Sequence, residues 1–130
     1  MTKKKAVAVA VIATVIGFAL FAHYDMQEAR RIHAENLLKA EEFKREFDRD
    51  VKLGTRLEAV EEYLRTKPVQ TQRSFTSNDG RTTVDALRIQ VVNERSPVWG
   101  CGRYSVGIIA KITKDRLESA RVSEWSFDCV

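Results

Sequence analysis

Residues 104–127 read YSVGIIAKITKDRLESARVSEWSF, and this stretch decides the fold. In its first half, apolar side chains occupy every second position: Tyr104, Val106, Ile108, Ala110 and Ile112. Because successive side chains of a strand point to opposite faces, this period of two predicts a β-strand with one buried face. Residues 113–116 predict a tight turn, and residues 117–127 predict a strand that runs back beside the first.

The returning strand changes the parity of its apolar positions. They shift from Ala120 and Val122 to Trp125 and Phe127. An extra residue in one strand of an antiparallel pair produces such a shift. The pattern therefore predicts a β-bulge within this strand.

Two further strands are predicted upstream of this hairpin. Within residues 69–75, every second position (Val69, Thr71, Arg73 and Phe75) alternates with a polar residue. Within residues 84–91, Leu87, Ile89 and Val91 occupy alternating positions. The triplet Asn78-Asp79-Gly80 between them is a strong turn signal. We expect a four-stranded antiparallel meander with helices against one face, which is an α+β two-layer sandwich.

A long helix is predicted before the strands. Residues 24–50 contain no glycine or proline and are rich in good helix formers. An apolar stripe at helical spacing ends in Phe43 and Phe47, which we expect to pack on the domain. The best heptad register places His33 and Asn36 in its seam, so a stalk is favoured over a dimerising helix.

A second, shorter helix is predicted after Gly54. Thr55 and Glu58 have the spacing of a capping box, in which each side chain bonds a free amide of the first helical turn. The helix is expected to begin at Thr55 and to run to about residue 66, before Pro68.

The N-terminal stretch from Ala6 to Ala22 reads AVAVAVIATVIGFALFA and contains no charged side chain. As a helix it is about 25 Å long, near the lower limit for crossing a bilayer core. Lysines at positions 3–5 precede it, and such residues favour the cytoplasmic side. We expect residues 1–23 to be a single-pass transmembrane anchor, with the remaining chain outside the cytoplasm.

A cleaved signal peptide is the alternative, because it has the same basic start and apolar core. The apolar run is longer than a usual signal core. A cut after Ala22 would place Leu20 where a small residue is needed, whereas a cut after Ala19 stays open.

The charge distribution argues against a nucleic-acid partner. The formal net charge is +4, and the three N-terminal lysines supply most of it. The rest of the chain mixes both signs, as solvated surfaces do, and has no basic cluster for phosphates.

The two cysteines are expected to form a disulfide. A three-residue loop at 114–116 would place Cys101 opposite Cys129 at the open end of the last hairpin. Two free buried thiols are the alternative. No CxxC spacing exists and no histidine lies in this half, so no metal site is expected.

The sequence contains no catalytic constellation, and we expect neither an enzyme nor a cofactor. His23 and His33 are the only histidines, and both are interpreted as exposed helix residues close to the anchor and away from the domain. Nucleotide-binding, metalloprotease and serine-hydrolase motifs are absent. The carboxylate pairs Glu61–Glu62 and Glu124–Asp128 are interpreted as surface groups, with a carboxylate hydrolase at Glu124 and Asp128 as the minor alternative.

One loop combines residue types that are common in binding hot spots. Residues 96–102 read SPVWGCG, and Trp99 and the adjacent Arg103 are candidate binding residues. The alternative is that Trp99 folds back and caps the core.

The run Leu53-Gly54-Thr55, followed by Val60, Leu64 and Pro68, resembles the signature of SmpA/OmlA small envelope proteins, which include BamE-like proteins. Arg65 stands where that family has glycine, and the family's methionine and lipidation cysteine are absent. The resemblance implies a helix–helix–meander fold, a bacterial source and a non-catalytic envelope protein that binds other proteins or the cell wall.

These observations lead to one functional expectation. The chain would be an anchored protein of the bacterial inner membrane, with an anchor (residues 1–23), an amphipathic helix (24–52) and a periplasmic α+β domain (53–130). It would act through protein–protein contacts, in an accessory or assembly role. A secreted or anchored inhibitor or immunity-type module is the alternative.

Overall fold

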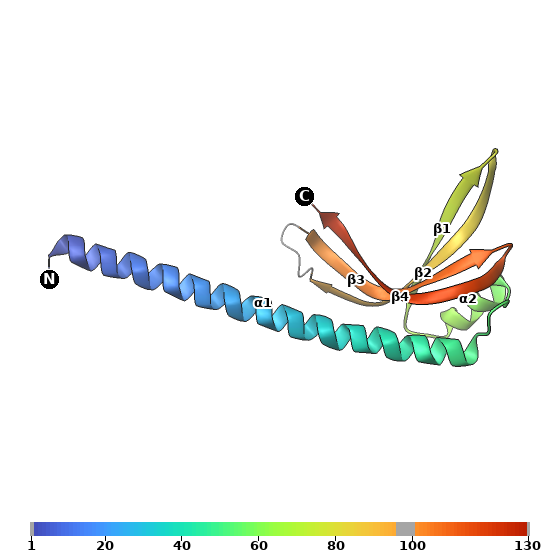
Figure 1. The fold of residues 1–130 in the computed structure, drawn as a ribbon, viewed down its shortest axis with the longest axis horizontal. Coiled ribbons are helices and arrows are strands. Elements are labelled where there is room, and N and C mark those ends of the chain that lie inside the picture. Colours follow the sequence, from blue (N-terminus) through green and yellow to red (C-terminus); the bar gives the residue numbers. More distant parts are fainter. Residues whose placement is uncertain (1, 96–100, 130) are drawn as a thin grey trace. The chain divides into compact units, whose positions relative to one another are not determined.

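The computed structural model describes residues 2–95 and 101–129, and the side chains of these residues except 95, 101 and 127–129. The elements are α1 (Lys3–Asp50), α2 (Leu57–Arg65), β1 (Gln70–Asn78), β2 (Arg81–Arg95), β3 (Cys101–Thr113) and β4 (Arg116–Cys129) (Figure 1). The predicted order of a long apolar helix, a short helix and a four-stranded antiparallel sheet is confirmed.

Helix α1 runs without a break from the apolar N-terminal segment into the predicted amphipathic helix. Its length and composition would allow it to cross a membrane, a property that signal sequences share. The chain divides into two compact units, residues 1–32 and residues 33–130. The unit that contains the sheet thus includes the last turns of α1, ahead of the boundary expected at residue 53.

The four strands follow one another in the sheet in the order β1-β2-β3-β4. The β1–β2 and β3–β4 hairpins each close through two residues with positive φ. These are Asp79 (52°) with Gly80 (75°), and Lys114 (52°) with Asp115 (60°). Two left-handed residues give the turn that matches the twist of antiparallel strands. The predicted turn at Asn78-Asp79-Gly80 is confirmed, and the predicted three-residue loop at 114–116 is wrong.

A bulge at Glu118 compensates for the shorter turn. Ile112 pairs with Leu117, but Lys111 pairs with Ser119, so Glu118 is left out of the register. From Ser119 onward the pairing is regular, so the bulge predicted among the later apolar positions of this strand is wrong.

The shorter turn and the bulge at Glu118 together decide which residues meet at the open end of the β3–β4 hairpin. Cys101 and Cys129 are partners in the register, as the sequence predicted. The register places their backbones opposite each other, and the side chains of both lie outside the described ones. The disulfide stays a prediction.

A second bulge in β2 changes which side chains face the helices. Gln90 pairs with Gly107 and Val92 with Val106, so Val91 is left out of the register. Because side chains alternate along a strand, Val92 and Glu94 share the face of Ile89. The sequence did not predict this bulge.

Helix α2 begins without the predicted capping box. Its N-cap is Arg56 with no side-chain cap, and the Thr55 hydroxyl donates instead to the Lys52 carbonyl at 2.6 Å. Residues 54–57 run beside the start of β4: the Leu57 amide donates to the Asp115 carbonyl at 2.9 Å and the Leu117 amide to the Thr55 carbonyl at 2.9 Å. Backbone groups of β4 and its turn thus satisfy an amide that a cap would otherwise serve.

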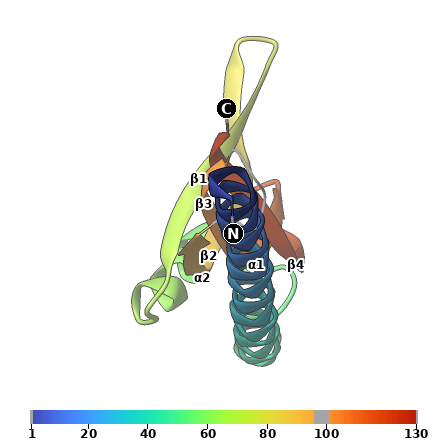
Figure 2. The same cartoon turned by 90° about the vertical axis from the view of Figure 1, so that its left-hand side faces the viewer.

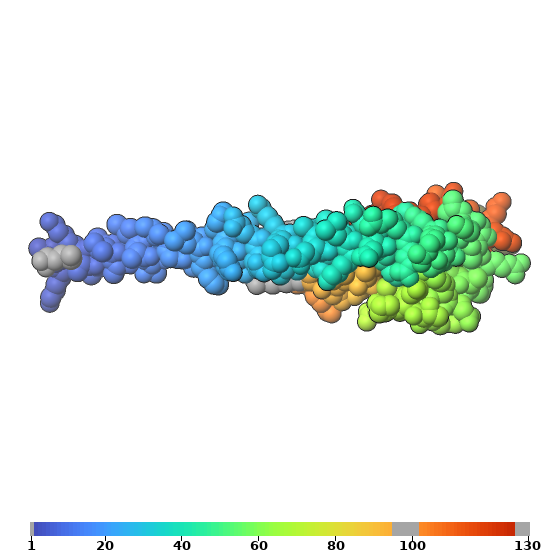
Figure 3. Space-filling model, turned by 90° about the horizontal axis from the view of Figure 1, so that it is seen from below, coloured from blue at the N-terminus to red at the C-terminus, as the bar shows by residue number. Residues whose placement is uncertain are grey.

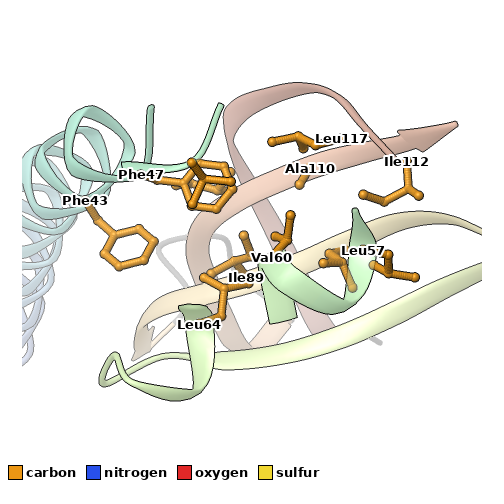
Figure 4. Close-up of a cluster of buried hydrophobic side chains, with 12 residues drawn as sticks. Phe43, Phe47, Leu57, Val60, Leu64, Ile89, Ala110, Ile112 and Leu117 are labelled. Atoms are coloured by element: carbon orange, nitrogen blue, oxygen red, sulfur yellow. The ribbon is translucent and has the colours of Figure 1, made fainter. Parts of the chain in front are cut away.

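One hydrophobic core joins the helices to the sheet (Figure 4). The prediction that Phe43 and Phe47 pack on the domain is confirmed, since both are buried in it. Figure 3 views residues 33–130 from below and shows the surface formed by the C-terminal end of α1 and by α2. The other buried members are Val51, Leu57, Val60, Leu64, Leu87, Ile89, Ile108, Ala110, Ile112 and Leu117.

Candidate functional site

A cluster of polar side chains lies next to the core, where α1 meets three strands. Its members are His33 and Asn36 of α1, Glu94 of β2, Tyr104 of β3 and Glu124 of β4. His33 and Asn36 are one helical turn apart and so share a face of α1. Glu94 turns toward them because of the bulge at Val91, and Tyr104 is its partner in the register.

The contacts within this polar cluster are specific. His33 Nδ1 contacts the Glu94 carboxylate, and His33 Nε2 lies 3.1 Å from Oε1 of Glu124. Asn36 donates from Nδ2 to the second oxygen of Glu94, and the Tyr104 hydroxyl donates to Glu124. The Tyr104 ring meets the imidazole edge to face, with 5.3 Å between centroids.

Two members of the cluster are largely buried. The Glu94 side chain is 5% exposed, and that of His33 is 20% exposed. Both ring nitrogens of His33 face carboxylate oxygens, one of Glu94 and one of Glu124. Since a buried charge without partners is costly, His33 and Asn36 stabilise Glu94 in this position.

Tyr104 acts in this cluster as a hydrogen-bond donor. Burial of the phenol raises the pKa of Tyr104 to about 12, and its hydrogen bond to Glu124 and the nearby charges of Glu124 and Glu94 act in the same direction. Because the phenol keeps its proton at neutral pH, it does not supply a base or a nucleophile there.

The cluster therefore fits a structural clasp better than a reaction centre. Each of its carboxylates already accepts hydrogen bonds inside the cluster, and none of its members is an activated nucleophile. No group of three histidine, cysteine or acidic side chains suited to a metal ion occurs among the residues that the structure describes. What the five residues do is tie α1 to β2, β3 and β4.

The expectation that both histidines lie away from the domain is wrong for His33. Only His23 stays exposed on α1, with its Nε2 2.9 Å from Nε2 of Gln27. The signal was present in the sequence, because His33 and Asn36 interrupt the apolar stripe of the long helix. Polar residues on a packing face indicate polar partners across the interface.

The other predicted site residues are not brought together in the described structure. Trp99 lies outside the described residues, and Arg103 is an exposed residue of β3. Glu124 belongs to the polar cluster, whereas the side chain of Asp128 is not among those described. Glu61, whose side chain is 15% exposed, accepts a hydrogen bond from Arg73 Nε at 3.0 Å, so it is paired within the domain.

The face of the sheet that points away from the helices carries a polar hollow, which the sequence did not predict. Its volume is about 270 Å³, and we call it the outer hollow. Trp125 reaches it because the pairing of β4 is regular beyond Ser119, which leaves Glu124 on the inner face and Trp125 on the outer one. It is lined by Gln70, Thr71, Gln72, Arg88, Gln90 and Trp125.

The tip of the β1–β2 hairpin extends beyond the rest of the sheet (Figures 1 and 2). Pairing of β2 with β3 begins at Ala86, so residues 75–84 pair only within their own hairpin. We call this segment the ribbon. Phe75 in it is 57% exposed, and β1 is an edge strand of the sheet.

No family model matches the chain, and no curated protein or solved structure matches it either.

Proposed function

We propose that this protein is a single-pass protein of the bacterial inner membrane that binds another envelope protein and catalyses no reaction. Residues 6–22 of α1 would be the anchor, with the N-terminus in the cytoplasm and residues 33–130 in the periplasm. The length and apolar composition of α1 support an anchor, and the three lysines before it support this orientation. We further infer that the α+β domain is a two-layer sandwich.

The ribbon is the observation that carries the proposal. An isolated two-stranded hairpin is marginally stable in water, and an edge strand leaves a row of unpaired backbone groups. The ribbon has both features and also exposes Phe75. A partner that adds a strand to β1, or that covers Phe75, would supply the missing contacts.

The polar cluster supports the non-catalytic part of the proposal. Its hydrogen-bonding groups already face one another, so a substrate would have to break contacts that are partly buried. The likeness of residues 53–68 to the SmpA/OmlA signature agrees, since that family binds other envelope components.

Site-specific crosslinking in intact membranes tests the proposal. A photoreactive residue replaces Phe75 in the full chain, and the matched control carries it at Lys39, which is exposed on α1. We expect one protein adduct from position 75 and none from position 39. We also expect Phe75→Ser to lower recovery of the same protein in mild detergent. Equal labelling from both positions, or no adduct from position 75, would argue against a partner at the ribbon.

The inhibitor or immunity-type alternative is tested by releasing the domain from the membrane. Since Phe43 and Phe47 belong to the core, and His33 to the polar cluster, a soluble version has to begin at or before residue 33. If that version blocks an enzyme as well as the full chain does, the alternative is favoured. If activity requires residues 6–22, an anchored accessory role is favoured.

A further inference from the structure

We propose that the outer hollow binds a saccharide that carries carboxylate groups. This inference concerns the face of the sheet opposite the helices and does not depend on a protein partner at the ribbon. It rests on three features of this face, which are a flat apolar ring, amide side chains and guanidinium side chains, and the last two have no partner among the described residues.

Trp125 supplies the apolar surface. The tip of its indole, atom Cη2, lies 3.0 Å from the point where a Cβ atom of residue 107 would be, so the ring extends from β4 across the backbone of Gly107. Gln90 is the partner of Gly107 in the register. The indole thus reaches toward β2 as part of the lining of the hollow, where the apolar C–H face of a sugar ring can stack on it.

The amide side chains supply the polar surface. Gln70 pairs with Gln90, and Gln72 pairs with Arg88, so these four lie together on one face of β1 and β2. A glutamine amide both donates and accepts hydrogen bonds, as recognition of hydroxyl groups requires. None of the three glutamines has a side-chain hydrogen bond within the described part of the chain. Their hydrogen-bonding capacity is therefore open to a ligand.

The charge of this face selects an anion. Arg88 and Arg121 are both partners of Ile109, one on each side of β3, which separates them by about 10 Å. Neither has an ion pair with a described residue. Toward the hollow, the outward positions carry no carboxylate: Gln70, Gln72, Gln90, Asn93, Ser105, Gly107, Ile109, Ser123 and Trp125. On the other side of Arg121, the Glu118 carboxylate is paired with Lys111 at 3.2 Å. Guanidinium groups match the planar geometry of carboxylates.

The size and polarity of the hollow favour a saccharide over a protein. A stable protein interface buries about 800 Å² on each partner around an apolar centre. The hollow has a volume of about 270 Å³ and one aromatic side chain among polar ones. A short, hydroxyl-rich, anionic ligand uses all of these groups.

The test uses the ¹⁵N-labelled full chain in a detergent without sugar headgroups, such as a phosphocholine detergent. Trigalacturonate is the probe, maltotriose is the neutral control, and a triglutamate peptide represents acidic proteins. We expect trigalacturonate alone to shift the indole N–H signal of Trp125 and the amide signals of Gln70, Gln72 and Gln90. The amide signal of Phe75 should not move.

Variants locate the site. Arg88→Gln should weaken binding of trigalacturonate about tenfold, because it removes a charge-assisted hydrogen bond. The matched control Arg65→Gln, on α2, should leave the affinity unchanged. Trp125→Phe should weaken binding while the amide signal of Ile108 in the core stays in place, which separates loss of binding from loss of folding.

Three results would overturn the proposal. These are no shift with trigalacturonate, equal shifts with maltotriose, and stronger binding of triglutamate at the same signals, which would assign the hollow to acidic polypeptides.

Discussion

Gly107 is the residue at which the backbone of β2 and a side chain of β4 leave no room for a Cβ atom. A Cβ atom here would lie 1.9 Å from the carbonyl oxygen of Ile89 on β2 and 3.0 Å from Cη2 of Trp125. The first contact is with backbone, so a small rotation of a side chain cannot relieve it. Close approach of two strands therefore requires glycine at this position.

We expect Gly107→Ala to lower the free energy of unfolding by about 1–3 kcal/mol or more, as overpacked sites do. Ser123→Ala is the matched control, since Ser123 is the neighbour of Gly107 on β4 and its side chain shares the outer face. Urea unfolding followed by circular dichroism measures both. An unchanged midpoint for Gly107→Ala would mean that β2 and β3 are far enough apart to accommodate a Cβ atom at this position.

His33 and Glu94 should depend on each other energetically. Removing either one leaves the other partly buried without its partner, so a cycle of His33→Ala, Glu94→Gln and the double variant should give a coupling of about 1–3 kcal/mol. The exposed pair Lys44–Asp48 on α1 is the control, with about 0.5 kcal/mol expected. A coupling no larger than that of the control would mean that the polar cluster does not hold α1 on the sheet.

The raised pKa of Tyr104 predicts that the folded chain loses stability in strong alkali. Its pKa is raised to about 12 in the folded chain, whereas an unfolded tyrosine ionises near pH 10. Tyr104 therefore contributes stability below about pH 10, and this contribution is lost as the pH rises toward 12. The difference in unfolding free energy between the wild type and Tyr104→Phe should shrink over this range. A difference that grows with pH would contradict the donor role of the phenol.

At the scale of elements, Cys101 and Cys129 are register partners at the open end of the β3–β4 hairpin. If Cys101 and Cys129 are bonded, Cys129→Ser should cost about 2–4 kcal/mol of stability. The double serine variant should lose no more than the single one, because the first change already removes the bond. Alkylation of the unfolded wild type under non-reducing conditions should label no thiol. Labelling of two thiols would show that the bond is absent.

The elements themselves were predictable because their signals are local. The period of two in residues 104–112, the triplet at Asn78 and the glycine-free run of residues 24–50 each depend on near neighbours in the sequence. The compensating turn and bulge at Glu118 left the predicted pairing of the cysteines intact, although the predicted loop length was wrong.

The polar cluster and the outer hollow were not predictable in the same way. Glu94 faces α1 because Val91 is left out of the register, and no local feature of the sequence marks that bulge. His33 meets Glu94 across 61 positions of sequence, a contact that only the packing of α1 on the sheet creates. The outward position of Trp125 was not predicted, because the parity change before it was interpreted as a bulge, whereas the pairing there is regular.

At the scale of the whole molecule, the topology proposal predicts where the C-terminus lies. A reporter that is active only outside the cytoplasm, fused after Val130, should be active and should stay with the membrane after an alkaline wash. Replacing Lys3, Lys4 and Lys5 by glutamine should reduce the active fraction, because these residues favour the cytoplasmic side. An inactive reporter would place the domain in the cytoplasm. An active reporter released by the wash would indicate a cleaved signal peptide.

Glu118 makes the C-terminal strand sensitive to changes of length. Deleting this one residue would move every later position of β4 by one step against β3, which exchanges the two faces. Glu124 would leave the polar cluster, Trp125 would leave the outer hollow, and Cys129 would no longer pair with Cys101. Loss of a single codon would disturb all three, whereas Glu118→Ala keeps the phase. In relatives of this chain, a turn that is longer by one residue should therefore accompany loss of the bulged residue, so that the later register of β4 is kept.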